Sequence, residues 1–175
     1  YMSEPVQRRC VHPLGDQRGY PIDRVIADFV SGAMERLVLE HEHHDVLVVE
    51  GQGSLVHPSY SAVTLGILHG ALPHALVMCF EAGRETVTGV EHLGLPSLAR
   101  LIEINEMMAS LEHPCKVVAV AMNGRRLESE EAETYRASLE EELALPVSDI
   151  FRNGPQRIVD AVEQARQQWL ASEEN

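Results

Sequence analysis

The sequence predicts an α/β protein in which helices cover both faces of a mostly parallel sheet, giving three layers. Short apolar runs, typical of strands buried on both faces, recur along the chain. Between them lie segments whose apolar residues recur at helical spacing. Strands that alternate with helices form βαβ units, and such units build parallel sheets.

The elements follow in order along the chain. Residues 1–21 contain prolines and glycines without periodicity, which predicts an irregular arm. We expect one α/β domain over residues 22–172 and a frayed tail over residues 173–175. The helices are predicted over residues 23–40, 60–70, 97–111, 129–143 and 155–170, and the strands over residues 46–49, 75–80, 116–121 and 146–150.

The net charge limits the classes of partner that the protein can bind, and the cysteine content indicates its cellular compartment. The 27 acidic residues outnumber the 14 basic ones, so the net charge of -13 repels phosphate backbones and anionic membranes. We expect no nucleic acid and no membrane as partner, but a small anionic substrate held in a locally positive pocket; a homo-oligomer is left open. Three widely spaced cysteines and no apolar run of membrane-spanning length indicate a cytoplasmic protein.

The run "DVLVVEGQGSLVHPSYS" carries the first candidate site. Glu50 ends a predicted strand and is followed by Gly51, Gln52, Gly53 and Ser54. Ligands of parallel sheets bind outside the carboxyl ends of the strands, where a carboxylate can hold Mg²⁺, orient water or act as a base. The glycines allow either a close backbone approach or a turn with positive φ. The alternative is a glutamate that binds loop amides, with glycines that serve only the turn.

Three further residues follow predicted strands or the loop beside them. His57 is either an acid–base or phosphate-binding group, or a loop histidine bonded to backbone. Arg84 could clamp a carboxylate or phosphate, or form a surface ion pair. Asn123 could contact a base edge or a carboxylate, although "NG" is also a turn signal, which we favour slightly.

Several motifs are absent or assigned no ligand. The chain contains no phosphate-binding G-x-x-x-x-G-K-[ST] loop, no G-x-G-x-x-G and no G-x-S-x-G nucleophile elbow. The histidines of "HEHHD" precede a predicted strand, at the end of the sheet away from ligands, so we assign no metal there. Glu50 is the candidate ligand if Mg²⁺ is used.

The segments "VIADFVSGAMERLVL", "VVEGQGSLVHPSY", "CFEAGR", "CKVVAVAMNG" and "LPVSDIFRNG" resemble a bacterial family described as D-glutamate N-acetyltransferase-like, formerly a domain of unknown function. The resemblance covers residues 19–161 and implies a P-loop NTPase-like fold in the C-terminal domain of a longer protein. Family members place a phosphate-binding loop and a strand ahead of this region, and residues 1–18 show neither, so we expect an N-terminally incomplete sheet.

The resemblance also implies an activity. Acetyl-CoA would donate its acetyl group to the amine of D-glutamate, with Glu50 or His57 as base and Arg84 on a carboxylate. By similarity to dethiobiotin synthetase, the amides of residues 51–54 would approach an anionic group, and Asn123 would lie near a base or adenine-bearing cofactor. The alternatives are an enzyme that uses ATP and Mg²⁺ to activate a carboxylate, and a non-catalytic fragment or paralogue without the phosphate-binding loop.

Overall fold

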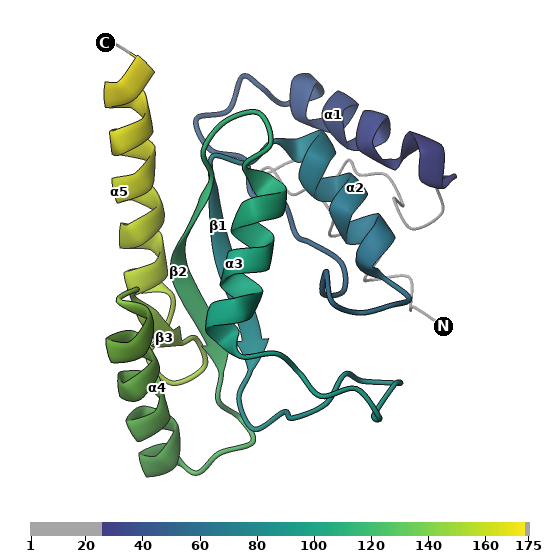
Figure 1. Ribbon diagram of the computed structural model, residues 1–175. Helices are drawn as coiled ribbons and strands as arrows, with labels where there is room; N and C mark the ends of the chain where they lie inside the picture. The colour runs from purple at the N-terminus through teal and green to yellow at the C-terminus, as the bar shows by residue number, and fades with distance from the viewer. Residues whose placement is uncertain (1–25, 174–175) are drawn as a thin grey trace. The chain divides into compact units, whose positions relative to one another are not determined.

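A computed structural model describes residues 26–173 of the chain (Figure 1). The chain divides into two compact units, Tyr1–Pro73 and His74–Asn175, and each is described by itself. Residues 1–21 and the last two residues of the predicted tail lie outside the described residues, so the predicted domain boundaries stay a prediction.

The first unit contains a pair of packed helices, α1 (Val30–Glu40) and α2 (Ser61–Ala71). Val30, Met34 and Leu37 of α1 are buried with Ile67 of α2. The helices approach closely at Gly70, where an added Cβ would lie 2.2 Å from the carbonyl oxygen of Ser31. The absence of a side chain at Gly70 therefore permits this packing.

The first predicted helix begins later than its apolar spacing indicates. α1 starts at Val30 after the 3₁₀ turn η2 (Ala27–Phe29), and residues 23–25 of the predicted helix lie outside the described residues. Phe29 at the N-cap offers no side-chain oxygen to the first free amides. Apolar spacing marks the buried face but does not fix where such an uncapped helix begins.

The predicted strand over residues 46–49 is wrong. These residues form no strand, and only Val49 among them makes an isolated bridge. Val46 and Val48 are 46% and 67% exposed, whereas the prediction required burial on both faces. A strand needs partners for its backbone N–H and C=O groups, and an apolar run does not supply them.

The second unit is built on a parallel sheet with the strand order β1–β2–β3 (Figure 1). Its helices and strands lie close to the predicted ranges, with only small shifts at their ends. In chain order they are β1 (Ala75–Glu81), α3 (Leu98–Ala109), β2 (Lys116–Asn123), α4 (Ser129–Leu143), β3 (Val147–Asp149) and α5 (Gln156–Glu173).

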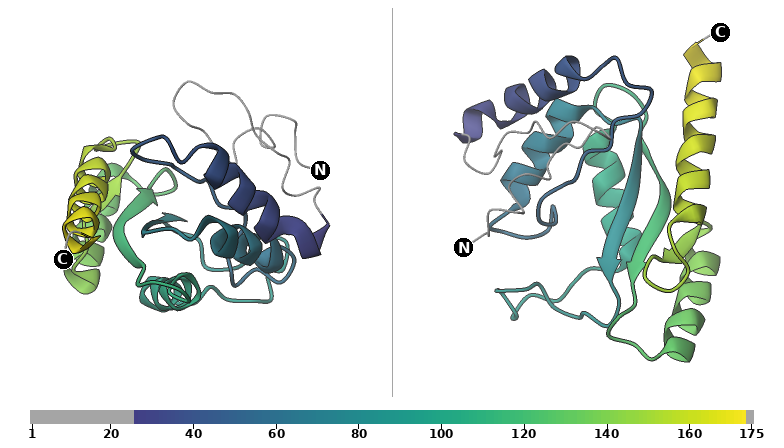
Figure 2. Two further views of the ribbon diagram at one scale, coloured as in Figure 1. Left: turned by 90° about the horizontal axis from the view of Figure 1, so that it is seen from above. Right: turned by 180° about the vertical axis from the view of Figure 1, so that it is seen from behind.

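One face of this sheet forms the core of the second unit. Val120 and Met122 of β2 are buried with Val147 of β3, against apolar residues of α3 and α4. Ala119 and Ala121, which point to the opposite face, are buried as well. Helix α5 runs along β2 and β3 (Figures 1 and 2). β2 is buried almost continuously, as a strand covered on both faces is, whereas β1 is half-buried and its Cys79 is exposed.

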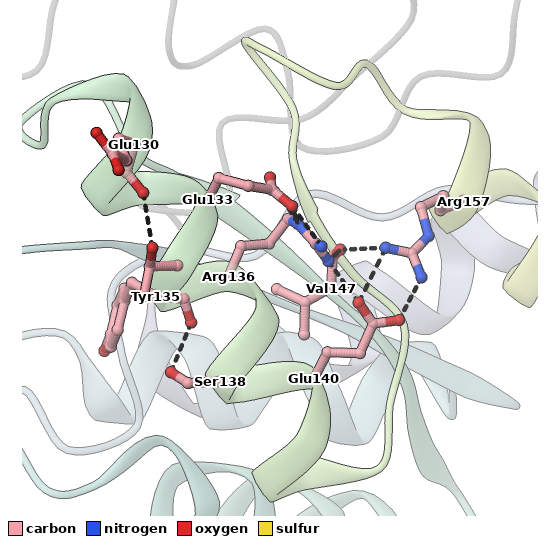
Figure 3. A network of polar contacts seen from close by, with 9 residues as sticks. Glu130, Glu133, Tyr135, Arg136, Ser138, Glu140, Val147 and Arg157 are labelled. Carbon is pink, nitrogen blue, oxygen red and sulfur yellow. Dashed lines mark hydrogen bonds and ion pairs between the residues drawn. The ribbon is translucent and has the colours of Figure 1, made fainter.

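The outer edge of β3 is covered by side chains (Figure 3). Arg136 of α4 and Arg157 of α5 each donate a hydrogen bond to the carbonyl oxygen of Val147, at 3.2 and 3.1 Å. Glu140 accepts hydrogen bonds from both guanidinium groups, and Glu133 binds Arg136 at 2.7 Å. A backbone acceptor that an edge strand would otherwise expose is thereby occupied.

Candidate functional site

The carboxyl ends of the three strands meet at one edge of the sheet in the second unit. Glu81 of β1 lies opposite Asn123 of β2, and Met122 lies opposite Asp149 of β3. The loops that follow these strands therefore lie next to one another. They carry four of the chain's 14 basic residues, Arg84, Arg125, Arg126 and Arg152, which we call the arginine edge.

Glu81 joins the first two of these loops. Its carboxylate accepts a hydrogen bond from Arg84 Nη2 at 2.5 Å and pairs with Arg126 Nε at 3.2 Å. Partial burial raises the pKa of Glu81, but the hydrogen bond from Arg84 and the charges of both arginines outweigh it, so the pKa is lowered overall. Glu81 is therefore a carboxylate at neutral pH and fixes two guanidinium groups.

Asp149 joins the second and third loops. It is almost fully buried, and its Oδ2 accepts a hydrogen bond from Arg152 Nη1 at 2.6 Å. Arg152 also donates through Nη2 to the carbonyl oxygen of Leu127 at 2.7 Å. Burial raises the pKa of Asp149, but the hydrogen bonds from Arg152 and from the amides of Phe151 and Gly124 together lower it by more. The pKa of Asp149 is therefore lowered overall, and the group stays ionised.

Gly124 is required where the second and third loops touch. A Cβ at this position would lie 2.3 Å from Asp149 Oδ2 and 2.7 Å from Arg152 Nη1. Any side chain here would displace the buried ion pair. The absence of a side chain thus lets Asp149 and Arg152 approach the backbone that follows β2.

Arg125 differs from the other three arginines of the edge. Its guanidinium carbon lies 3.4 Å from the centroid of the Phe151 ring, which is a cation–π contact. Glu81 and Asp149 hold the other three guanidinium groups, whereas Arg125 forms no ion pair with an acid within residues 26–173. Such an edge can bind an anion through planar, charge-assisted hydrogen bonds.

The predicted residues Glu50 to Ser54 lie in the first unit, in an irregular segment before α2. Glu50 and Gly51 are exposed, and Gln52 is half-buried. Neither Gly51 nor Gly53 has a positive φ, so neither forms the positive-φ turn that glycine would permit. Gly53 instead meets a close neighbour, because a Cβ there would lie 2.7 Å from that of Tyr60.

Hydrogen bonds hold the loop between Gly53 and α2. Thr64 Oγ1 donates to the carbonyl oxygen of Gly53, and the amide of His57 donates to that of Ser54 at 2.9 Å. The amide of Ser59 donates to His57 Nδ1 at 3.1 Å, and the His57 ring lies 4.4 Å from that of Tyr60. Nδ1 of His57 is therefore already engaged as an acceptor from the backbone.

Arg84 and Asn123 both lie at the carboxyl edge, where the sequence places them. Arg84 forms the ion pair with Glu81. Asn123 Oδ1 accepts a hydrogen bond from the amide of Arg125 at 3.2 Å, which is the turn favoured from the sequence. Four further residues of this edge stand just after predicted strands, where the sequence leads us to expect a ligand, but they were assigned no role: Glu81, Arg125, Arg126 and Arg152. Asp149 was missed, because it lies within the predicted strand over residues 146–150.

Neither a metal cluster nor a membrane span is found in the part of the chain that the structure describes. Among residues 26–173, no group of three or more His, Cys, Asp and Glu side chains is arranged to hold a metal ion. In the "HEHHD" segment, His41 Nδ1 bonds the carbonyl oxygen of Leu37 at 2.8 Å, and the rings of His43 and His44 lie 4.1 Å apart. No helix over the same residues has the length and apolar character needed to cross a bilayer.

A comparison with models of known protein families shows the family to which this chain belongs. Residues 14–159 match the model described as "Domain of unknown function (DUF1611_C) P-loop domain". The chain belongs to the DUF1611 family. The α/β fold with a parallel sheet agrees with the P-loop type of this DUF1611 domain.

Other DUF1611 relatives support the same assignment. A crystal structure of a DUF1611 family protein from Anabaena variabilis superposes with a TM-score of 0.80 at 34% identity, over 84% of this chain and 44% of that one. Two curated relatives named D-glutamate N-acetyltransferase, from Tritonibacter scottomollicae and a Pseudoalteromonas species, are each 39% identical. They match 82% and 81% of this chain but 44% and 43% of their own lengths, so the chain spans less than half of each relative.

Proposed function

We propose that this chain forms part of an N-acetyltransferase that transfers the acetyl group of acetyl-CoA to the amine of D-glutamate. The observation that carries the proposal is the 39% identity to two relatives that bear this name, over four-fifths of the chain. The arginine edge supports it, because every ligand of this reaction is anionic. D-glutamate carries two carboxylates and acetyl-CoA carries phosphates, and a chain of net charge -13 must bind them at a locally positive place.

The reaction places two demands on the protein. The amine must lose a proton so that its nitrogen can form a bond to the thioester carbon, and the bond from that carbon to sulfur then breaks to release CoA as a thiol. The developing oxyanion must be met by hydrogen-bond donors. The ammonium group loses one proton to expose its lone pair, and the nitrogen loses a second proton after it has bonded to the thioester carbon. One of these protons goes to the CoA thiolate and the other is released to solvent, and the transfer consumes no ATP.

At the arginine edge, the proposal assigns anion binding to Arg84 and Arg126. Glu81 holds both guanidinium groups, and its pKa is lowered, so it orients them as an ionised partner. Arg84 is 39% exposed and Arg126 is 55% exposed, so each retains donors that face solvent. A carboxylate of D-glutamate is the expected ligand of Arg84.

In the first unit, the proposal assigns the base role to Glu50. Glu50 is exposed at the start of the "EGQGS" segment, and the amides of residues 51–54 are candidates for binding an anionic group. His57 suits the base role less well, because the amide of Ser59 already donates to its Nδ1. His57 therefore stays the second candidate for the base.

A product assay tests this proposal. The protein expressed from its complete reading frame is incubated with D-glutamate and either acetyl-CoA or ATP plus Mg²⁺, and the products are identified by mass spectrometry. N-acetyl-D-glutamate without ADP is the expected result. ADP without acetylation would replace the proposal with a carboxylate-activating enzyme, which the P-loop description of the family makes the main competitor.

Two variants test the residue assignments in the same assay. Glu50→Gln removes a carboxylate without changing its size, and the turnover rate is expected to fall by about a hundredfold, as for loss of a general base. Arg84→Gln is expected to raise the KM for D-glutamate more than it lowers kcat. Glu50→Gln with undiminished turnover would remove Glu50 from the base role.

A further inference from the structure

The arginine edge contains one guanidinium group that the protein orients without neutralising. Arg84 and Arg126 pair with Glu81, and Arg152 pairs with Asp149. Arg125 has no ion pair with an acid in residues 26–173, and the contact of its side chain that the structure shows is with the face of the Phe151 ring. A guanidinium stacked on a ring keeps its N–H donors in its own plane, so stacking orients the group and leaves the donors free for a ligand.

The backbone of Arg125 and that of Phe151 are held by the same kind of turn. The amide of Arg125 donates to Asn123 Oδ1 at 3.2 Å, and the amide of Phe151 donates to Asp149 Oδ1 at 3.2 Å. In each case an Asn or Asp side chain at a strand end fixes the backbone two residues later. Because β2 and β3 are paired neighbours, the turns that follow them lie side by side. The side chains of Arg125 and Phe151, each two residues after a strand end, therefore stack on each other.

The surroundings favour an anion at this place. Arg126 follows Arg125 directly, and one carboxylate, Glu81, is shared between Arg126 and Arg84. Phe151 is 49% exposed, so the stacked pair lies at the surface, where a ligand can reach it. A planar fork of free donors beside a second guanidinium group matches the geometry of a carboxylate or a phosphate.

We propose that Arg125, oriented by Phe151, is a specificity-determining residue that binds an oxyanion of the substrate. Arg125 is the contacting group, and Phe151 is its positioning residue. The inference rests on the proposed function for the identity of the ligands, which are a carboxylate of D-glutamate or a phosphate of acetyl-CoA. The binding of an oxyanion by the stacked guanidinium follows from the geometry alone.

Direct binding measurements test this inference separately from the activity. The protein from the complete reading frame is titrated by calorimetry with CoA, with D-glutamate and with inorganic pyrophosphate, each alone. Arg125→Gln is expected to weaken one of the first two ligands by about tenfold or more, the usual effect of losing a charge-assisted hydrogen bond. Loss for CoA alone identifies the oxyanion as a phosphate, and loss for D-glutamate alone identifies it as a carboxylate.

Substitutions of Phe151 leave the charge of the edge unchanged, so they test the orientation of Arg125 separately from its charge. Phe151→Ala is expected to weaken the same ligand by about threefold, because the charge stays but its orientation is lost. Phe151→Tyr keeps the ring and should bind as the unchanged protein does. Arg166→Gln removes one charge from the middle of α5 and serves as the matched control. Unfolding curves of all four variants establish that each is folded.

Each outcome decides the inference. If Arg125→Gln weakens no ligand beyond the Arg166→Gln control, or if Phe151→Tyr fails to restore binding, the inference is overturned. If the unchanged protein binds neither CoA nor D-glutamate, the proposed function fails. The titration with pyrophosphate then tests whether Arg125 binds an oxyanion at all. Pyrophosphate binding that Arg125→Gln weakens then supports the oxyanion site. Binding that is absent, or that survives the substitution, overturns it.

Discussion

At the scale of single residues, the two described cysteines differ sharply in reactivity. Cys115 is buried, and burial together with the nearby charge of Glu106 raises its pKa to about 11, against a smaller opposite effect of Lys116. Cys79 is exposed in β1. Because the thiolate is the reactive form, Cys115 should resist alkylation while the protein is folded.

This difference can be measured with iodoacetamide near neutral pH on the variant Cys10→Ser, which removes the cysteine outside the described residues. Peptide mass spectrometry is expected to find the label on Cys79 and at least about tenfold less on Cys115, because the raised pKa leaves little thiolate and burial blocks access of the reagent. Denaturant should make both thiols react alike. Equal labelling of Cys115 without denaturant would contradict its burial.

Gly124 provides the second residue-scale prediction. Gly124→Ala inserts a Cβ at 2.3 Å from Asp149 Oδ2 and should lower the free energy of unfolding by about 2 kcal/mol, as overpacking at a buried site does. Gly94→Ala is the control, since nothing lies within 4 Å of a Cβ there. Urea unfolding measures both. A Gly124→Ala protein as stable as the control would show that the second and third loops do not meet as described.

At the scale of elements, the ion-pair network on the outer edge of β3 should make stability depend on pH (Figure 3). Hydrogen bonds from Arg157 are the largest cause that lowers the pKa of Glu140; burial opposes them, and Arg136 adds to them. A carboxyl group whose pKa is lower in the folded state stabilises the fold above its unfolded pKa, ordinarily 4.5. That contribution is lost as the pH falls through the lower folded pKa.

Glu140→Gln tests this dependence. At about pH 7 the variant should be less stable than the unchanged protein by about 1 kcal/mol, the upper range for partly exposed pairs. The difference should shrink as the pH falls below 4.5, because the unchanged protein then loses the same charge. Urea unfolding at several pH values measures it. A difference that stays constant down to about pH 3 would show that the Glu140 charge is not what stabilises this edge.

The elements also show which parts of the fold local sequence patterns can predict. The helix over residues 129–143 is predicted to the residue, because its acidic first turn and its apolar spacing both mark it. The segment over residues 46–49 is entirely apolar but forms no strand, since strand pairing depends on residues elsewhere in the chain. Arg84 and Asn123 are located by their position after predicted strands. The stack of Arg125 on Phe151 could not be predicted, because it depends on the register between β2 and β3.

At the scale of the whole molecule, the charge distribution makes the arginine edge distinctive. The chain has a net charge of -13, so an anionic substrate is repelled from most of its surface. Four arginines gather at the carboxyl ends of three strands, and Arg125 among them forms no ion pair with an acid within residues 26–173. We propose that this edge of the second unit, in a DUF1611 domain, binds the anionic groups of the substrates.

Nuclear magnetic resonance of the arginine side chains tests that claim most directly. The chain has 13 arginines and one lysine, so ¹⁵N-labelled arginine gives a readable set of Nε–H signals, which single Arg→Gln variants assign. Titration with D-glutamate and then acetyl-CoA should shift the signals of Arg84, Arg125 and Arg126 while that of Arg36 on α1 stays in place. Shifts confined to arginines away from the carboxyl edge, with Arg84, Arg125 and Arg126 unmoved at saturating ligand, would contradict the claim.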